Sequence, residues 1–132
     1  MTATLERPIV PRKILIVDDE PDLLETCVRL LRQVGHTCLT ASTGREAIAL
    51  IEAERPNLVV TDFRLPTTDG LAVARHARRS SPPTPVIVFT AYPSPHTKRE
   101  AHEAGAIIFL PKPFSAAEFL DAVGRALASP SA

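Results

Sequence analysis

Five short apolar runs alternate along the chain with longer segments in which apolar residues recur every three or four positions. The runs lie at residues 13–17, 36–41, 58–62, 85–90 and 106–110. Apolar runs of this length, bounded by residues that favour turns, are typical of strands, and the spacing between them is typical of amphipathic helices. The run at 36–41 is more polar than the others, so we expect it at an edge of the sheet.

Residues that favour helix starts support the helices that this pattern predicts. Pro21 suits the first position of a helix. Thr43 with Glu46, and Ser115 with Glu118, match capping boxes, in which each residue satisfies a free backbone amide of the other. These signals place helix starts directly after three of the predicted strand–helix turns.

The segment at 94–105 predicts a helix with few apolar residues. Its only clear apolar contacts are Ala101 and Ala104. Because packing of an apolar face supplies most of a helix's stability, we expect this helix to be the most weakly anchored of the five.

The alternation of strands and helices predicts an α/β fold. We expect a flavodoxin-like, doubly wound sheet of five parallel strands in the order 2-1-3-4-5, with helices on both faces. The 132 residues suit one domain, which we place at residues 13–128. A flexible N-terminal arm at 1–12 and a C-terminal tail at 129–132 are expected to flank it.

Composition narrows the classes of function. The 15 basic and 15 acidic residues balance and aromatic residues make up only 5% of the chain, so direct binding of nucleic acid is not expected. No apolar run approaches the roughly 18 residues of a membrane span, and the N-terminus lacks a signal peptide, so we expect a cytoplasmic protein without membrane contact. Cys27 and Cys38 are expected to be small buried side chains, with a disulfide between them the less favoured alternative.

Chemically competent side chains follow four of the five predicted strands. Asp18 and Asp19 follow the first, Asp62 ends the third, Thr90 ends the fourth and Lys112 follows the fifth. Each alone has an ordinary interpretation as a turn, a cap or a solvated charge. Because the carboxyl ends of parallel strands share one edge of the sheet, we expect the five side chains to meet there.

That set of side chains suits phosphoryl chemistry. Three neighbouring carboxylates repel one another, and a hard divalent cation such as Mg²⁺ would relieve the repulsion. A carboxylate such as Asp62 can attack phosphorus and form an acyl phosphate. Lys112 would neutralise charge on the transferring group, and Thr90 would donate its hydroxyl to a phosphoryl oxygen.

These motifs resemble the receiver domain of two-component response regulators. The resemblance covers about residues 13–128 and rests on Ile-Leu-Ile-Val-Asp-Asp-Glu at 14–20, Asp-Phe-Arg-Leu-Pro at 62–66, Asp-Gly at 69–70, Thr-Ala at 90–91 and Lys-Pro-Phe at 112–114. It implies that the domain is a signalling domain rather than an enzyme, with self-catalysed phosphotransfer and dephosphorylation only.

The resemblance also implies a role for each residue. Asp62 would be the phosphoacceptor, and Lys112 would pair with the phosphoryl group. The implied Mg²⁺ ligands are Asp18, Asp19, Asp62 and the backbone carbonyl of Arg64. Thr90 would be the switch hydroxyl and Phe109 the switch aromatic, although a strand-end aromatic is also an ordinary core residue. A cis peptide bond is implied between Lys112 and Pro113.

The partners implied by the resemblance lie on both sides of a signalling event. A sensor histidine kinase or a phosphotransfer protein would donate the phosphoryl group. A downstream effector protein, or an output domain missing from this chain, would respond to it. A homodimer through the fourth helix, fifth strand and fifth helix is a further implied assembly.

Two other functions remain open from the sequence. A phosphatase of the haloacid dehalogenase type also has an aspartate nucleophile at a strand end, but it requires a second aspartate two residues later, where this chain has Arg64. A phosphorylation-independent interaction module with the receiver fold would not need the complete acidic set, Thr90 and Lys112. Dinucleotide binding is disfavoured because Asp18 and Asp19 occupy the turn where glycines should cradle phosphate.

Overall fold

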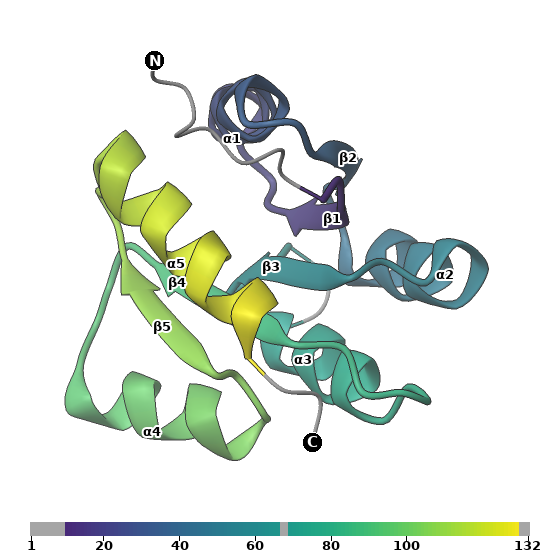
Figure 1. Ribbon diagram of the computed structural model, residues 1–132. Helices are drawn as coiled ribbons and strands as arrows, with labels where there is room; N and C mark the ends of the chain where they lie inside the picture. Colours follow the sequence, from purple (N-terminus) through teal and green to yellow (C-terminus); the bar gives the residue numbers. More distant parts are fainter. Residues whose placement is uncertain (1–9, 67–68, 130–132) are drawn as a thin grey trace.

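The computed structural model describes residues 10–66 and 69–129, which form one sheet with helices on both faces (Figure 1). The strands are β1 (Lys13–Val17), β2 (Thr37–Ala41), β3 (Leu58–Asp62), β4 (Val86–Thr90) and β5 (Ile108–Pro111), and the helices are α1 (Pro21–Gln33), α2 (Gly44–Glu54), α3 (Gly70–Arg78), α4 (Pro95–Glu103) and α5 (Ala116–Ala128). All neighbouring strands pair in parallel, in the order β2-β1-β3-β4-β5. The predicted fold and strand order are confirmed.

Alternate residues of the strands build two apolar cores, one on each face of the sheet. Leu15, Val59 and Val88 pack under α2 and α3, together with Ala101 of α4 and the C-cap Ala104 that follows it. Ile16 and Val60 pack on the opposite face under α1 and α5. The central strands β1, β3 and β4 are almost wholly buried, as their continuous apolar runs predict, whereas the edge strands β2 and β5 are partly exposed.

Most of the predicted helix caps are present. Ser115 and Glu118 form the complete capping box at the start of α5. At α2 the Thr43 hydroxyl accepts a hydrogen bond from the Glu46 amide, but the Glu46 carboxylate accepts from the Ser42 amide at 2.8 Å instead of from that of Thr43. This part of the α2 prediction is wrong by one residue, because Glu46 reaches past the N-cap.

The fifth strand begins two residues later than the apolar run predicts. Gly105 has a φ of 108°, and the Ala106 amide donates to the Ala101 carbonyl at 3.0 Å, so the chain is still closing α4 at this point. Ala101 is the buried residue within α4. This supports the expectation that α4 is weakly anchored.

The ends of the chain lie largely outside the described residues. The predicted arm at 1–12 is described from residue 10. There the Arg12 carbonyl accepts a hydrogen bond from the Thr37 amide at 2.9 Å, and the Arg12 amide donates to His36 Nδ1 at 3.2 Å.

Cys27 is buried and Cys38 half-buried, and both are free thiols. Within the described ranges, none of the helices has the length and apolar character that crossing a membrane requires.

Candidate phosphoryl site

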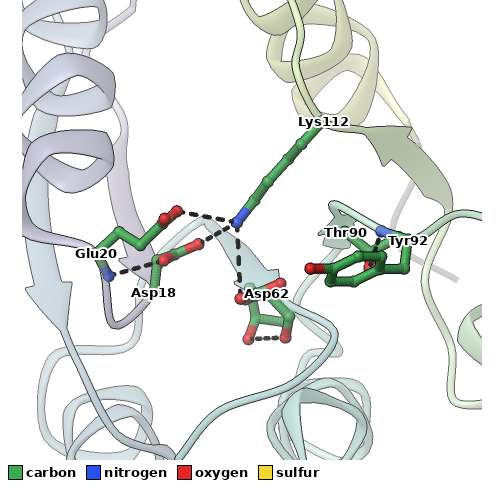
Figure 2. A network of polar contacts seen from close by, with 7 residues as sticks. Asp18, Glu20, Asp62, Thr90, Tyr92 and Lys112 are labelled. Atoms are coloured by element: carbon green, nitrogen blue, oxygen red, sulfur yellow. Dashed lines mark hydrogen bonds and ion pairs between the residues drawn. The ribbon is translucent and has the colours of Figure 1, made fainter.

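The carboxyl edge of the sheet brings Asp18, Asp62, Thr90 and Lys112 close to one another (Figure 2). Asp62 stands beside Phe89 of β4 in the parallel register. Asp18 and Asp62 follow Ile16 and Val60 by two positions, so strand alternation puts both carboxylates on the sheet face covered by α1 and α5. Thr90 follows Val88 by two positions and belongs to the opposite face, under α3 and α4.

Lys112 is the cation at the centre of the site. Its Nζ lies 2.8 Å from Asp18 Oδ2 and 3.6 Å from both Asp62 Oδ2 and Glu20 Oε1. Asp18 is fully buried, and its second oxygen accepts a hydrogen bond from the Glu20 amide at 2.9 Å. The Lys112 amide donates to the Thr90 carbonyl at 2.8 Å, which anchors the lysine to the end of β4.

Burial and crowding perturb the protonation of this cluster. Burial raises the pKa of Asp62 from 3.8 to about 6, and the neighbouring Asp18 and Asp19 charges add to the rise while Lys112 opposes it. Burial alone would lower the pKa of Lys112, but its hydrogen bond to Asp18 and the surrounding carboxylates raise it overall. The Lys112 ammonium therefore does not fully offset the burial of Asp62 and the neighbouring charges of Asp18 and Asp19.

The three aspartates fit a divalent cation. One carboxylate oxygen from each of Asp18, Asp19 and Asp62 lies within 4.8 Å of the other two. Carboxylate oxygens are the ligands that Mg²⁺ prefers. A cation bound there would add to the positive charge of Lys112 and would lower the pKa of Asp62. Arg64, whose carbonyl was the fourth predicted ligand, is exposed at the start of the β3–α3 loop, where it forms a backbone bridge with Asp69.

The predicted switch residues lie on the other face of the sheet. Thr90 is buried, and its hydroxyl accepts a hydrogen bond from the Tyr92 amide at 3.1 Å. Phe109 is half-buried and pairs in register with Val88, two positions before Thr90. Tyr92 is 80% exposed, and Figure 2 shows its ring extending from the end of β4 toward Asp62.

Three residues of this edge make contacts to which the sequence analysis assigned no role. Glu20 is a third carboxylate partner of Lys112. Gly70 lies so close to β3 that a Cβ there would overlap the Asp62 carbonyl oxygen. The Phe89 ring faces Lys112, with the Nζ 4.8 Å from the ring centroid. The Asp-Gly pair was part of the family resemblance, but no sequence signal marked Glu20 or Phe89 as neighbours of Lys112.

A larger hollow lies elsewhere. It has a volume of about 770 Å³ and is lined at the amino ends of the strands by residues that include Arg55, Asn57 and Pro85. None of the three clustered aspartates lines it. Asp19 instead lines a smaller hollow of about 540 Å³, together with Glu20 and the first residues of α1.

Comparisons with known proteins agree on one family. The family model described as the response regulator receiver domain matches residues 14–124. The response regulator MprA of Mycolicibacterium vanbaalenii is 40% identical over 111 residues, which are 84% of this chain and 48% of MprA. The transcriptional regulatory protein PdtaR of Mycobacterium tuberculosis is 34% identical over 119 residues, 89% of this chain and 58% of PdtaR. The chain thus spans about half the length of these curated relatives.

Solved structures of similar chains share the whole fold. A CheY-like response regulator receiver domain from Methanospirillum hungatei superposes with a TM-score of 0.84 at 30% identity, covering 89% of this chain and 94% of that one. The signal receiver domain of the putative response regulator NarL from Mycobacterium tuberculosis also gives 0.84 at 30% identity, covering 92% of this chain and 100% of that one.

Proposed function

The chain belongs to the response regulator receiver domain family, and we propose that it accepts a phosphoryl group on Asp62 and signals through its α4–β5–α5 surface. The observation that carries the proposal is Lys112 Nζ held between Asp18 and Asp62, at 2.8 Å and 3.6 Å, within a cluster of three aspartates. Receiver domains of response regulators are generally signalling domains rather than enzymes.

The proposed transfer needs little from the protein beyond position and charge. An Asp62 carboxylate oxygen attacks the phosphorus of a phosphohistidine, the P–N bond breaks, and the imidazole of the donor leaves as the acyl phosphate forms. The Lys112 ammonium offsets negative charge on the phosphoryl oxygens. Bound to Asp18, Asp19 and Asp62, Mg²⁺ would supply further charge neutralisation, and the Arg64 carbonyl is a proposed fourth ligand.

The proposed switch runs through β4 and β5. The Thr90 hydroxyl would turn toward the new phosphoryl group, which gives up its hydrogen bond from the Tyr92 amide. The space it leaves would admit the half-buried Phe109 from the neighbouring strand. Within α4, Ala101 is the buried residue. We therefore expect α4 and the loop that joins it to β4 to shift at a lower free-energy cost than the rest of the fold.

The proposed output surface consists of the lightly anchored α4, the partially exposed edge strand β5 and the adjoining α5. The phosphoryl donor that we propose is a sensor histidine kinase or a phosphotransfer protein, and the proposed location of the transfer is the cytoplasm. The proposed reader is an effector protein, an output domain outside this chain, or a second copy that pairs through α4, β5 and α5. The phosphatase alternative is not favoured, since Arg64 stands where its second acid is needed.

Incubation with acetyl phosphate and Mg²⁺ tests phosphoryl acceptance directly. Intact-mass spectrometry should find one added phosphoryl group, which hydroxylamine removes because an acyl phosphate is labile to that nucleophile. EDTA should prevent the addition. Protein that stays unmodified across a range of donor and Mg²⁺ concentrations would contradict the proposal and favour the phosphorylation-independent module.

Mg²⁺ should stabilise the folded domain in the absence of any donor. A ligand that binds only the folded state at a hundred times its Kd adds about 3 kcal/mol to the free energy of unfolding. Thermal unfolding at increasing MgCl₂ should therefore show a rising Tm, with NaCl at equal ionic strength as the control. The rise should shrink in Asp19→Asn. A Tm that follows ionic strength alone would mean that the aspartate cluster does not hold the cation.

A further inference from the structure

An aromatic ring also lies beside the Lys112 ammonium. Its Nζ lies 4.8 Å from the centroid of the Phe89 ring, within the distance at which a cation is attracted to an aromatic face. The Lys112 side chain is only 13% exposed, so the ammonium has lost most of its hydration. The attraction between the ammonium and the face of the Phe89 ring offsets part of the lost hydration, without a hydrogen bond.

The Phe89 ring is itself held rigidly. Phe89 is fully buried on the central strand β4 and stacks on Phe114 with ring centroids 5.7 Å apart. Phe114 stacks in turn on Phe119 of α5 at 5.5 Å. Phe114 follows Lys112 by two residues, so the stack also ties the loop that carries the lysine to β4 and to α5.

The other partners of Lys112 are less suited to fix its position. Glu20 is 65% exposed, and Asp62 would change its charge and shape when it becomes an acyl phosphate. Asp18 is a proposed ligand of the cation. Phe89 is neither the phosphoacceptor nor a proposed ligand of the cation, so transfer leaves the charge of its ring unchanged.

We propose that Phe89 is a positioning residue for phosphoryl transfer, whose ring face holds the Lys112 ammonium toward Asp62. This inference rests on the proposed function, because it assigns Phe89 to the lysine of that same site. It predicts that the electron density of the ring, and not only its bulk, sets the rate of transfer.

Fluorination of the ring tests this directly. Pentafluorophenylalanine at position 89 keeps the shape of the ring but removes the attraction of its face for a cation. The maximal rate of phosphorylation by acetyl phosphate should fall by about two- to thirtyfold. The donor concentration at half-maximal rate and the Mg²⁺ concentration that half-saturates the Tm rise should each change by less than a factor of about two, because the ring is a proposed ligand of neither the donor nor the cation.

The same substitution at Phe119 is the matched control. It alters the stack on the same middle ring, Phe114, but at the end remote from Phe89. Its effect on the rate should stay below about twofold by the same measure. Equal slowing by both fluorinated rings, or an unchanged rate with fluorine at 89, would overturn the assignment.

A second readout does not depend on phosphorylation. In the NMR spectrum the Lys112 Cε protons should be shifted upfield by the Phe89 ring current, and Phe89→Leu should abolish that shift. Its absence from the wild-type spectrum would overturn the inference. If the wild type accepts no phosphoryl group at all, the proposed function fails, and this shift alone then decides whether Phe89 holds the lysine.

Discussion

Asp62→Asn is expected to abolish phosphoryl acceptance and, in the absence of metal, to stabilise the fold. Asparagine has the shape of aspartate but no nucleophilic carboxylate. It also has no charge to bury, whereas burial raises the pKa of Asp62 from 3.8 to about 6. With 14% of its side chain exposed, Asp62 is little screened by solvent, so we expect a gain of about 1–3 kcal/mol in the free energy of unfolding at neutral pH.

The pH dependence of that gain follows from the direction of the shift. Because the pKa of Asp62 is higher in the folded state than in the unfolded state, its favourable contribution is fully present below pH 3.8 and is lost as the pH rises through about 6. The variant has no such group. The difference in stability between variant and wild type should therefore be largest above pH 6 and should close as the pH falls toward 3.8.

Urea unfolding in EDTA at several pH values measures this difference, and intact-mass spectrometry with acetyl phosphate measures acceptance. Asp121→Asn is a matched control, since that carboxylate is 67% exposed on α5 and pairs only with its neighbour Arg125 among the described residues. It should change stability by less than about 0.5 kcal/mol. Labelling that survives Asp62→Asn would remove the residue from its role, and clear destabilisation would reveal a structural partner of the carboxylate.

Gly70→Ala is expected to destabilise the domain by about 3 kcal/mol or more. A Cβ at Gly70 would overlap the Asp62 carbonyl oxygen and lie 2.8 Å from its carbon, both of which belong to the backbone of β3. The Gly70 amide also donates to the Phe63 carbonyl at 2.8 Å. Neither side can move without shifting the strand end that carries the phosphoacceptor, so the rate of acceptance should fall as well.

Gly124→Ala is the matched substitution, because beyond its chain neighbours and the backbone of its own helix no atom lies within 4 Å of the position that its Cβ would take. Alanine favours a helix over glycine by about 1 kcal/mol, so this variant of α5 should be slightly more stable than the wild type. Chemical unfolding of both variants beside the wild type checks the pair. Equal midpoints for Gly70→Ala and the wild type would mean that the β3–α3 loop yields far more easily than its contacts suggest.

The sequence predicted the part of the site that strand order alone determines. Asp18, Asp62 and Lys112 meet because parallel strands present their carboxyl ends at one edge, and the apolar runs located those ends well. The cis peptide between Lys112 and Pro113, implied by the family resemblance, is also present. Periodicity was sufficient for these features because none depends on the rotation of a single side chain.

Features that depend on side-chain direction or loop path were beyond that reasoning. The apolar residues Ala106 and Ile107 extend the pattern of the fifth strand, but the left-handed backbone of Gly105 delays the strand. The contact between Phe89 and Lys112 requires a lysine to cross over the neighbouring strand. The late start of β5 and the path of the Lys112 side chain do not affect the spacing of apolar residues, so the sequence pattern could not predict them.

The exposed side chain at the end of β4 has a practical consequence. Tyr92 is the only tyrosine in a chain that contains no tryptophan. Its phenol therefore accounts for nearly all of the protein's intrinsic ultraviolet fluorescence, and it stands next to the residues proposed to rearrange. Emission quenching or recovery can thus be followed in unlabelled protein, in real time, without grafting a dye onto the surface under study.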